Sequence, residues 1–440
     1  MKHLFHSIIE SLTLEVSKNE FFTCSFYCES SNFVRINKAK IRQPGHVFQA
    51  SLQIDLIVGQ KHAISNISIT QDPAYNTSKI KESLTFLREQ IKDSLGDPYL
   101  LVNKDSSTSS SISNHSKNDI EFILNDIISK SSSFDVVGIL SEGSIATGTA
   151  NSNGQNHWHE THNFNFDWSL YHEKDKAVKA SYAGNVWDSK TFNEKMEWSK
   201  EQLNYLKLPP ISLTPGSYKT YLAPAALNEV IELLCWGGFS YKEQQTKGSS
   251  LLKLLEKEKS FHEKLTLFNN LENGLSPKFQ ASGFIKPTVT PLIKNGKHEG
   301  SMISPRSSVE YSTDHNGADN SESPTSIEVS PGTLSQNEVL KQLDTGLYIN
   351  NLWYLNYSDR SQCRMTGMTR FASFWVENGK INAPLNVMRF DDSAYKMLGK
   401  NLIDFTQERD LLIDPSTYSK RSTNSSYIPG ALINDFQLKL

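Results

Sequence analysis

The chain has 440 residues, of which 37 % are hydrophobic, 10 % aromatic and 21 % charged, and its formal net charge at pH 7 is −3. This length predicts two or three domains, and the weak net charge gives no indication of a nucleic-acid or anionic-membrane partner. No stretch approaches the roughly 20 apolar residues that a membrane-spanning helix needs, and four cysteines are too few for a disulfide framework, so we expect a cytoplasmic protein.

The N-terminal third predicts helices on either side of a set of strands. Residues 1–20 have apolar residues at helical spacing, whereas residues 21–69 have them at two-residue steps, which is typical of strands. Further helices are expected at 77–94 and 120–131. Between them, the serine-rich stretch 105–119 is expected to be a linker or an exposed loop, because it is too polar to pack.

The next part of the chain continues this alternation and then becomes rich in strands. Residues 135–172 predict two or three antiparallel strands with a tight turn at 152–154. Helices follow near 190–206 and at 223–236, where Pro224 and a pair of glycines are suitable start and stop signals. A polar insertion is expected at 312–332. Strand-like runs then occupy 346–357, 370–381 and 385–390, with a hairpin turn at Glu377-Asn378-Gly379.

These elements predict an α+β fold in which a mixed α/β N-terminal part precedes a β-rich C-terminal domain. The expected boundaries are an N-terminal α/β domain at 1–104, a polar linker or loop at 105–119, a central α/β region with a hairpin at 120–215, and a β-rich domain at 216–440.

The stretch "HWHETH" (157–162) contains three histidines and a glutamate, which are common zinc ligands. On a strand, His157 and His159 share one face while Glu160 and His162 share the other, so any metal would need a third ligand from elsewhere. The stretch also follows a hairpin turn. We therefore favour a solvated strand end over a metal site.

No other motif indicates a hydrolase. Each His-Glu pair (159, 172, 262 and 298) lacks a second histidine four or five residues after the first, so none forms a helical zinc site. There is no G-x-S-x-G motif, phosphate-binding loop or G-x-G-x-x-G motif. Cys363 lies between Arg360 and Arg364, which could lower its thiol pKa, but a buried structural thiol is the preferred interpretation.

Residues 346–390 are unusually dense in aromatic and arginine residues. Such residues dominate protein interfaces and can clamp carboxylates. The alternative is a β core whose arginines pair with Asp359, Asp391 and Asp392, and both interpretations stay open. The residues predicted to face a peptide or partner are Trp353, Tyr354, Asp359, Arg360, Arg364, Arg370 and Trp375.

Several stretches in the same order resemble the TldD/TldE (PmbA) family over about residues 25–438. They are "ESSNFVRINKAKIRQPG", "GSIATGTANSNGQ", "GLSPKFQASGF", "SPRSSVEY" and "GLYINNLWYLNYSDRSQCRMTGMTRFASFWVENGKINAPLNVMRF". The resemblance implies two kinds of subunit. The TldD type carries H-E-x-x-x-H and a late cysteine as zinc ligands, and the TldE (PmbA) type lacks them. The helix at 223–236 has no histidine and the last cysteine is Cys363, so the chain resembles the TldE type. Its region 352–375 is richer in aromatics and arginines than in the better-known TldE proteins, which indicates a distinct subgroup.

The resemblance implies a non-catalytic subunit of a zinc metallopeptidase complex that holds unfolded or small peptides extended and cuts them. An older label ties the family to modulation of DNA gyrase. We then expect no catalytic residue, metal ligand or cofactor in this chain, zinc in a TldD-type partner subunit, and a dimer with neither nucleic acid nor membrane as partner. Two alternatives stay open. One is a peptidase active alone, with a metal site that includes His157 and His159, and the other is a peptide-binding or scaffold homodimer without proteolysis.

Overall fold

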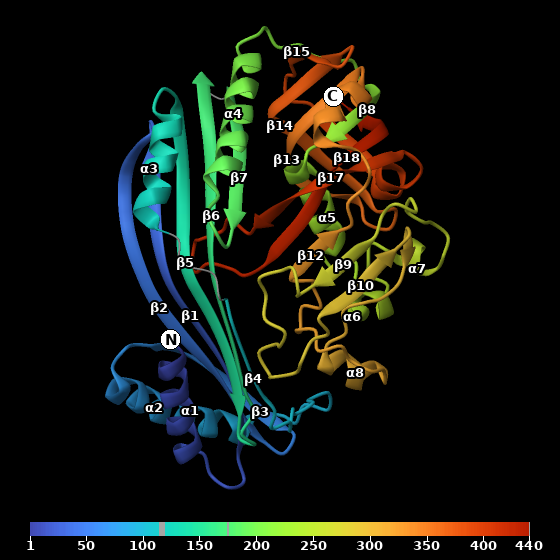
Figure 1. Ribbon diagram of the computed structural model, residues 1–440. Helices are drawn as coiled ribbons and strands as arrows, with labels where there is room; N and C mark the ends of the chain where they lie inside the picture. Colours follow the sequence, from blue (N-terminus) through green and yellow to red (C-terminus); the bar gives the residue numbers. More distant parts are fainter. Residues whose placement is uncertain (114–118, 174–175, 440) are drawn as a thin grey trace.

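Two β-sheets, one from each half of the chain, form the framework of this computed structural model, which describes residues 1–113, 119–173 and 176–439. The sheets lie side by side along the length of the molecule (Figure 1). With helices packed on both, the predicted α+β class is confirmed.

The first sheet has seven strands in the order β3-β2-β1-β5-β6-β4, and β7 also pairs with β6. All pairs are antiparallel except β4 with β6. The strand bounds are β1 (Phe21–Asn37), β2 (Lys40–Val58), β3 (Lys61–Ile69), β4 (Thr108–Ile112), β5 (Asp135–Asn151), β6 (Asn156–Glu173) and β7 (Lys176–Gly184).

The two faces of this sheet differ in chemistry because side chains alternate along each strand. Many even-numbered residues of β1, β2, β5 and β6, such as Phe26, Val136 and Trp168, are buried and apolar. Four helices cover their face, two at each end of the sheet (Figure 1). They are α1 (Lys2–Glu15), α2 (Pro73–Asp93), α3 (Ile120–Ser131) and α4 (Ser189–Leu206). Odd-numbered residues such as Glu29 and Asn163 lie on the other face, which is turned toward the second half of the chain.

The second sheet has eleven strands, with the order β11-β10-β9-β12-β18-β16-β14-β13-β8. In addition, β15 pairs with β14, β17 with β18, and β18 with β8. The strand bounds are β8 (Gly216–Leu222), β9 (Leu267–Asn270), β10 (Val289–Lys294), β11 (Lys297–His298), β12 (Ser326–Val329), β13 (Gly346–Asp359), β14 (Arg364–Glu377), β15 (Lys380–Pro384), β16 (Arg389–Ser393), β17 (Leu402–Ile413) and β18 (Ser425–Leu438). The short helical segments are α6 (Tyr241–Gln245), α7 (Leu252–Leu255), α8 (Pro305–Tyr311), α9 (Val339–Leu343), η1 (Gln336–Glu338) and η2 (Lys396–Lys400).

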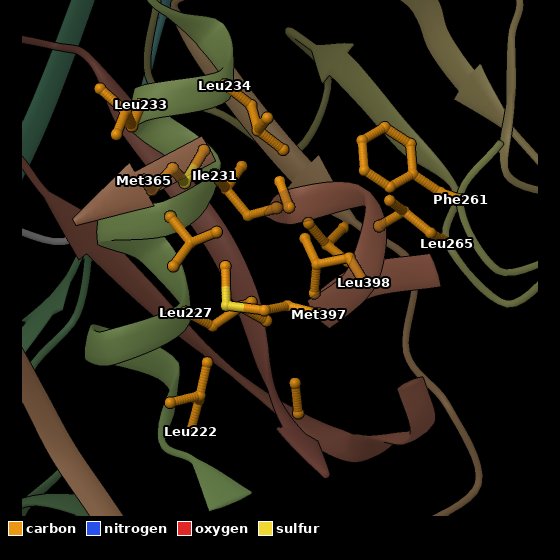
Figure 2. Packing of buried hydrophobic residues seen from close by; sticks show 14 of the residues in the cluster. Leu222, Leu227, Ile231, Leu233, Leu234, Phe261, Leu265, Met365, Met397 and Leu398 are labelled. Atoms are coloured by element: carbon orange, nitrogen blue, oxygen red, sulfur yellow. The ribbon is translucent and has the colours of Figure 1, made fainter. Parts of the chain in front are cut away.

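Helix α5 (Pro224–Cys235) is embedded in the core of the second half. Leu227, Ile231 and Leu234 are fully buried and, as Figure 2 shows, lie among side chains such as Met365 and Met397. Each such side chain stabilises the fold by about 1.5–3 kcal/mol on burial. The helix is therefore rigidly placed. Its remaining side carries the polar residues Asn228, Glu229 and Glu232, and their positions are fixed with it.

Helix α4 joins the two halves through a shared core. On one side it packs on β6 and β7. On the other, the Trp198 ring lies 5.9 Å from that of Tyr348 and the Tyr205 ring 6.0 Å from that of Phe374, centroid to centroid. The relative position of the two sheets is therefore fixed by apolar packing.

Most predicted elements are confirmed within a few residues, but two predictions are wrong. Part of the serine-rich stretch 105–119 is strand β4, whose exposed side chains need no core because its backbone pairs with β6; residues 114–118 lie outside the described residues. The stretch 312–332, expected to be a polar insertion, is in part a strand of the second sheet. It contains β12, and the buried Glu322 accepts hydrogen bonds from Ser240 Oγ (2.7 Å) and Ser304 N (2.8 Å). Within the described residues, no helix is long and apolar enough to cross a membrane.

Candidate functional site: a groove between the two sheets

A series of four cavities lies between the polar face of the first sheet and the second half of the chain. Each is lined from both halves, and neighbouring cavities share lining residues, so together they form one interdomain groove. Their volumes are about 640, 480, 510 and 300 Å³ in order along the groove. Pockets of this size hold small molecules or a few peptide residues.

We name the four cavities by their position and chemistry. They are the basic cavity (with Arg35, Arg42 and Val137), the acidic cavity (Asp167, Lys179, Asn228, Glu229, Glu232 and Asp414), the lysine cavity (Ser25, Tyr27, Gln280, Lys286 and Lys420) and the His62 cavity (Asp55, His62, Asp97 and Arg306).

The acidic cavity is built by one helix and one strand pair. Asn228, Glu229 and Glu232 form the polar stripe of α5, whose other sides are buried. Opposite them, Asp167 on β6 and Lys179 on β7 share the polar face of the first sheet. The helix and the sheet thus present carboxyl groups to one cavity from both sides.

The surroundings of these carboxyl groups raise their pKa values. For Glu229, Glu232 and Asp167 the main cause is partial removal from water, which disfavours the charged form. At Glu232, a hydrogen bond from Asn228 (2.8 Å) opposes the rise, and the negative charges of Glu229 and Asp414 add to it. The cavity is therefore suited to bind a cationic or amino group, which would relieve the repulsion.

A segment between β17 and β18, residues 414–424, lines three of the four cavities and is called the strap below. Arg421 anchors the strap in the polar face of the first sheet and is only 4 % exposed. Its guanidinium donates to Ser31 Oγ (3.2 Å), Gly143 O (3.3 Å) and Asn163 O (3.0 Å). The buried Glu29 accepts from Ser31 Oγ and from the backbone N of Arg421. The strap is thus held by a buried polar network.

The "HWHETH" stretch lies on β6, and the prediction that it is a solvated strand end is wrong. His157 and His159 share the polar face, as predicted, but this face is covered by the second half of the chain. His157 Nδ1 lies 2.8 Å from Ser109 Oγ and its ring stacks on Phe279, and His159 Nε2 lies 2.9 Å from the Leu275 carbonyl oxygen. Burial lowers the pKa of both imidazoles.

The side chains of the groove do not fit a catalytic zinc. Zinc sites use three or four converging His, Cys, Asp or Glu ligands, and within residues 1–113, 119–173 and 176–439 no group of three such side chains is placed to hold a metal ion. The polar stripe of α5 offers only carboxyl and amide groups. The cysteines are buried, and burial raises the pKa of Cys24, Cys28 and Cys363 to about 12, so they remain protonated thiols. For Cys363 this confirms the buried structural thiol.

The seven residues predicted to face a peptide or partner are all placed by the β13–β14 ribbon, and none of them lines the groove. Three of them form a cluster in which Trp353 and Tyr354 are exposed and Arg370 is partly buried. The Arg370 guanidinium lies 4.3 Å from the Trp353 ring centroid, and the Trp353 and Tyr354 ring centroids are 4.2 Å apart. A register shift after Trp353 and positive φ values at Tyr354 and Phe371 turn these side chains outward.

The other four predicted residues have separate local partners. Arg360 stacks on Trp236 and Tyr357, and Asp359 accepts from Ser361 and Gln362 within its own turn. Arg364 forms an ion pair with Asp391. Trp375 packs edge-on against Tyr218 and donates to Glu377 (2.6 Å). Internal pairing with a predicted carboxylate is therefore confirmed for Arg364. That Trp353, Tyr354 and Arg370 face a peptide or partner stays a prediction.

Sequence reasoning missed the groove residues. The signal for α5 was present, because Asn228, Glu229 and Glu232 interrupt an otherwise apolar helix at positions i, i+1 and i+4. No comparable signal marks Asp167, Lys179 or Lys286, which come from distant segments.

The comparisons with known proteins agree with this architecture. Residues 215–439, slightly more than half of the chain, match the family described as PmbA/TldA metallopeptidase C-terminal domain. No curated protein matches the sequence significantly. Among solved structures, TldE from Thermococcus kodakarensis has a TM-score of 0.78 at 13 % identity, over 99 % of this chain and 100 % of that one.

Two further structures have the same fold. One, from Thermotoga maritima, is described as a candidate modulator of a DNA gyrase and has a TM-score of 0.75 at 14 % identity, over 99 % of this chain and 100 % of that one. Another, from Bacteroides thetaiotaomicron, carries a similar description and has a TM-score of 0.73 at 14 % identity, over 100 % of this chain and 98 % of that one. At these identities the likeness concerns the fold alone.

Proposed function

This chain belongs to the PmbA/TldD metallopeptidase family, and on that premise we propose that it is the non-catalytic, TldE-like subunit of a peptidase complex. In this proposal the zinc lies in a homologous TldD-type subunit, and the two subunits act on unfolded or small peptides. The chain contributes a groove that accommodates extended peptide and excludes folded protein, and it works in the cytoplasm as part of a heterodimer.

The observation that carries the proposal is that the groove has the form of a peptide-binding site but its lining does not form a zinc site. An interdomain groove with a rigid helix along it has the form of a peptide-binding site. The polar stripe of this helix, however, holds Asn228, Glu229 and Glu232 and no histidine, and among the described residues no three ligands converge on a metal position. A subunit of this kind can hold a substrate but needs its chemistry from elsewhere. Exposed strand backbone at the edge of a sheet can add main-chain pairing to an extended peptide with little sequence preference.

The first alternative, a peptidase active alone, has less support. His157 and His159 already contact Ser109 and the Leu275 carbonyl oxygen, and no third ligand joins them within the described part of the chain. The second alternative, a scaffold homodimer without proteolysis, shares the groove with our proposal and differs only in the partner.

The test is to purify the chain alone and together with a homologous chain that carries H-E-x-x-x-H. We expect the isolated chain to bind zinc well below one ion per molecule and to leave an unstructured peptide intact, whereas the pair co-elutes and cleaves it. About one zinc per isolated chain with cleavage that His157→Ala abolishes would contradict the proposal and support the first alternative. Self-association with no cleavage in any combination would support the second.

A further inference from the structure

One buried basic side chain of the lysine cavity has no hydrogen-bond or ion-pair partner among the described residues. Lys286 lines the lysine cavity, is only 8 % exposed, and makes no side-chain hydrogen bond or ion pair among the described residues. A buried ammonium group without a partner is costly and therefore uncommon. Burial lowers the pKa of Lys286, and the charge of Asp319 offsets this effect only in part.

The other cations of this cavity are already engaged. Arg421 is bonded to Ser31, Gly143 and Asn163, as described above, and the Lys420 ammonium lies 4.4 Å from the Tyr27 ring centroid. The carboxylate of Asp319 accepts from Ser321 N (3.2 Å) and Ser321 Oγ (2.6 Å) and forms no ion pair with Lys286. Lys286 is therefore left as the cation that is available to a ligand.

A second donor faces the same cavity. Gln280 uses its side-chain oxygen to accept a hydrogen bond from Ser282 N at 2.7 Å, which orients its amide, and the Nε2 hydrogens have no acceptor among the described residues. One ammonium and one amide donor, with Asp319 and Asp414 also lining the cavity, suit a singly charged carboxylate better than a doubly charged phosphate.

We propose that the lysine cavity binds the carboxylate of a peptide that lies in the groove, with Lys286 as its counter-ion and Gln280 as a second donor. The inference rests on the proposed function in one respect, namely that the ligand of the groove is a peptide. The lysine and acidic cavities adjoin and share Thr325, Asp414 and Asn424. A peptide with its carboxylate at Lys286 therefore places its amino or cationic part toward Glu229 and Glu232, so charge sets its direction.

The experiment measures binding of fluorescent peptides to the full chain by anisotropy, and it needs neither the partner subunit nor cleavage. The probes are an N-acylated tetra-alanine with a free carboxyl terminus, its C-terminal amide, and the amide of Ala-Ala-Glu-Ala. We expect at least one carboxylate-bearing probe to bind tenfold or more tightly than the tetra-alanine amide. Preference for the first probe identifies a peptide C-terminus, and preference for the third identifies an acidic side chain.

The variant Lys286→Met should reduce this preference to less than twofold. Lys278→Met is the matched control, because Lys278 lies on the same segment but is paired with Glu272 at 2.6 Å outside the cavity, and it should keep the preference. Equal binding of all probes to the wild-type chain, or an unchanged preference in Lys286→Met, would overturn the inference. Failure of the proposed function would appear separately, as lack of association or cleavage with the zinc-bearing subunit.

A chemical measurement keeps the inference testable if the variant does not fold. Acylation of lysines in the wild-type chain, read by mass spectrometry, should show Lys286 protected by the carboxylate probe and not by the amide, while Lys278 reacts equally with either present. Equal labelling of Lys286 in both cases would contradict the inference.

Discussion

At the scale of single residues, Arg421 is the side chain on which the attachment of the strap depends. Its guanidinium satisfies the Gly143 and Asn163 oxygens, and its charge compensates the buried Glu29. Removing one member of a buried charged network leaves the other uncompensated and typically costs about 3–5 kcal/mol.

We therefore expect Arg421→Met to lower the free energy of unfolding by about 3 kcal/mol or more, measured by urea denaturation. The matched control is Lys420→Met, which removes an adjacent but exposed cation whose contact with the Tyr27 ring is worth about 0.5–1 kcal/mol. If Arg421→Met and Lys420→Met lowered the free energy of unfolding by the same small amount, the buried polar network would not hold the strap.

Glu232 is the residue whose ionisation should affect stability in an unusual direction. Partial removal from water raises its pKa in the folded chain, and because the side chain is still reached by solvent in the groove, the effect on stability is small. Between the usual carboxyl pKa and this raised value the folded state holds more protons than the unfolded state, so the free energy of unfolding decreases as the pH rises through this window.

Glu232→Gln should therefore raise the thermal midpoint at pH 7.5, by about 1 °C, and the gain should vanish as the pH is lowered to 4.5. Thermal denaturation from pH 4.5 to 8 measures this. Glu272→Gln should change the thermal midpoint in the opposite direction. The hydrogen bond from Lys278 lowers the pKa of Glu272, so the ionised carboxylate stabilises the fold at neutral pH and this stabilisation is lost in acid. If Glu232→Gln instead lowered the thermal midpoint at every pH, the ionised Glu232 carboxylate would be a stabilising contact.

At the scale of elements, the β13–β14 ribbon combines a structural part and an exposed part. Trp375 packs on Tyr218, whereas Trp353 and Tyr354 are 40 % and 68 % exposed and stack with Arg370 or with each other. Clusters of exposed aromatic and arginine side chains are typical interface hot spots. The ribbon therefore remains our predicted partner surface, centred on Trp353, Tyr354 and Arg370.

Trp353→Ala is expected to weaken association with the zinc-bearing subunit at least tenfold, or about 1.4 kcal/mol, and to leave the thermal midpoint within about 2 °C of the wild type. Sedimentation velocity and thermal denaturation measure the two quantities. Trp375→Ala, on the same strand pair, should mainly reduce stability instead. If Trp353→Ala associated with the zinc-bearing subunit as tightly as the wild type, this cluster would not be part of the interface.

At the scale of the whole molecule, the groove exists because two sheets are held apart and aligned. Helix α4 fixes their spacing through apolar contacts such as Trp198 with Tyr348, and the strap fixes it through Arg421. The face of the first sheet between these anchors is polar, so it cannot close against the second half as a dry interface. The charges of the groove then change along its length, from the carboxyl groups of α5 to Lys286.

The sequence by itself determined the elements of this protein and its family. Apolar periodicity is local, so it placed the four helices of the first half, α5 and the long strands within a few residues. Its motifs also carried the family resemblance. Backbone pairing needs no apolar side chain, which is why β4 was missed in a serine-rich stretch. The "HWHETH" histidines were assigned to solvent because their burial depends on the distant Leu275 and Phe279.

Only the tertiary structure decided where the chemistry lies. Asp167, Glu232 and Lys286 belong to segments far apart in the chain, and their convergence on one groove depends on how the two sheets dock. The spacing of residues in the sequence does not predict that docking, because the docking is set by the apolar surfaces of α4 and by the buried network of Arg421. The same side chains would be unremarkable surface charges on separate halves. Their altered pKa values arise from the protein that surrounds them, which no local pattern encodes.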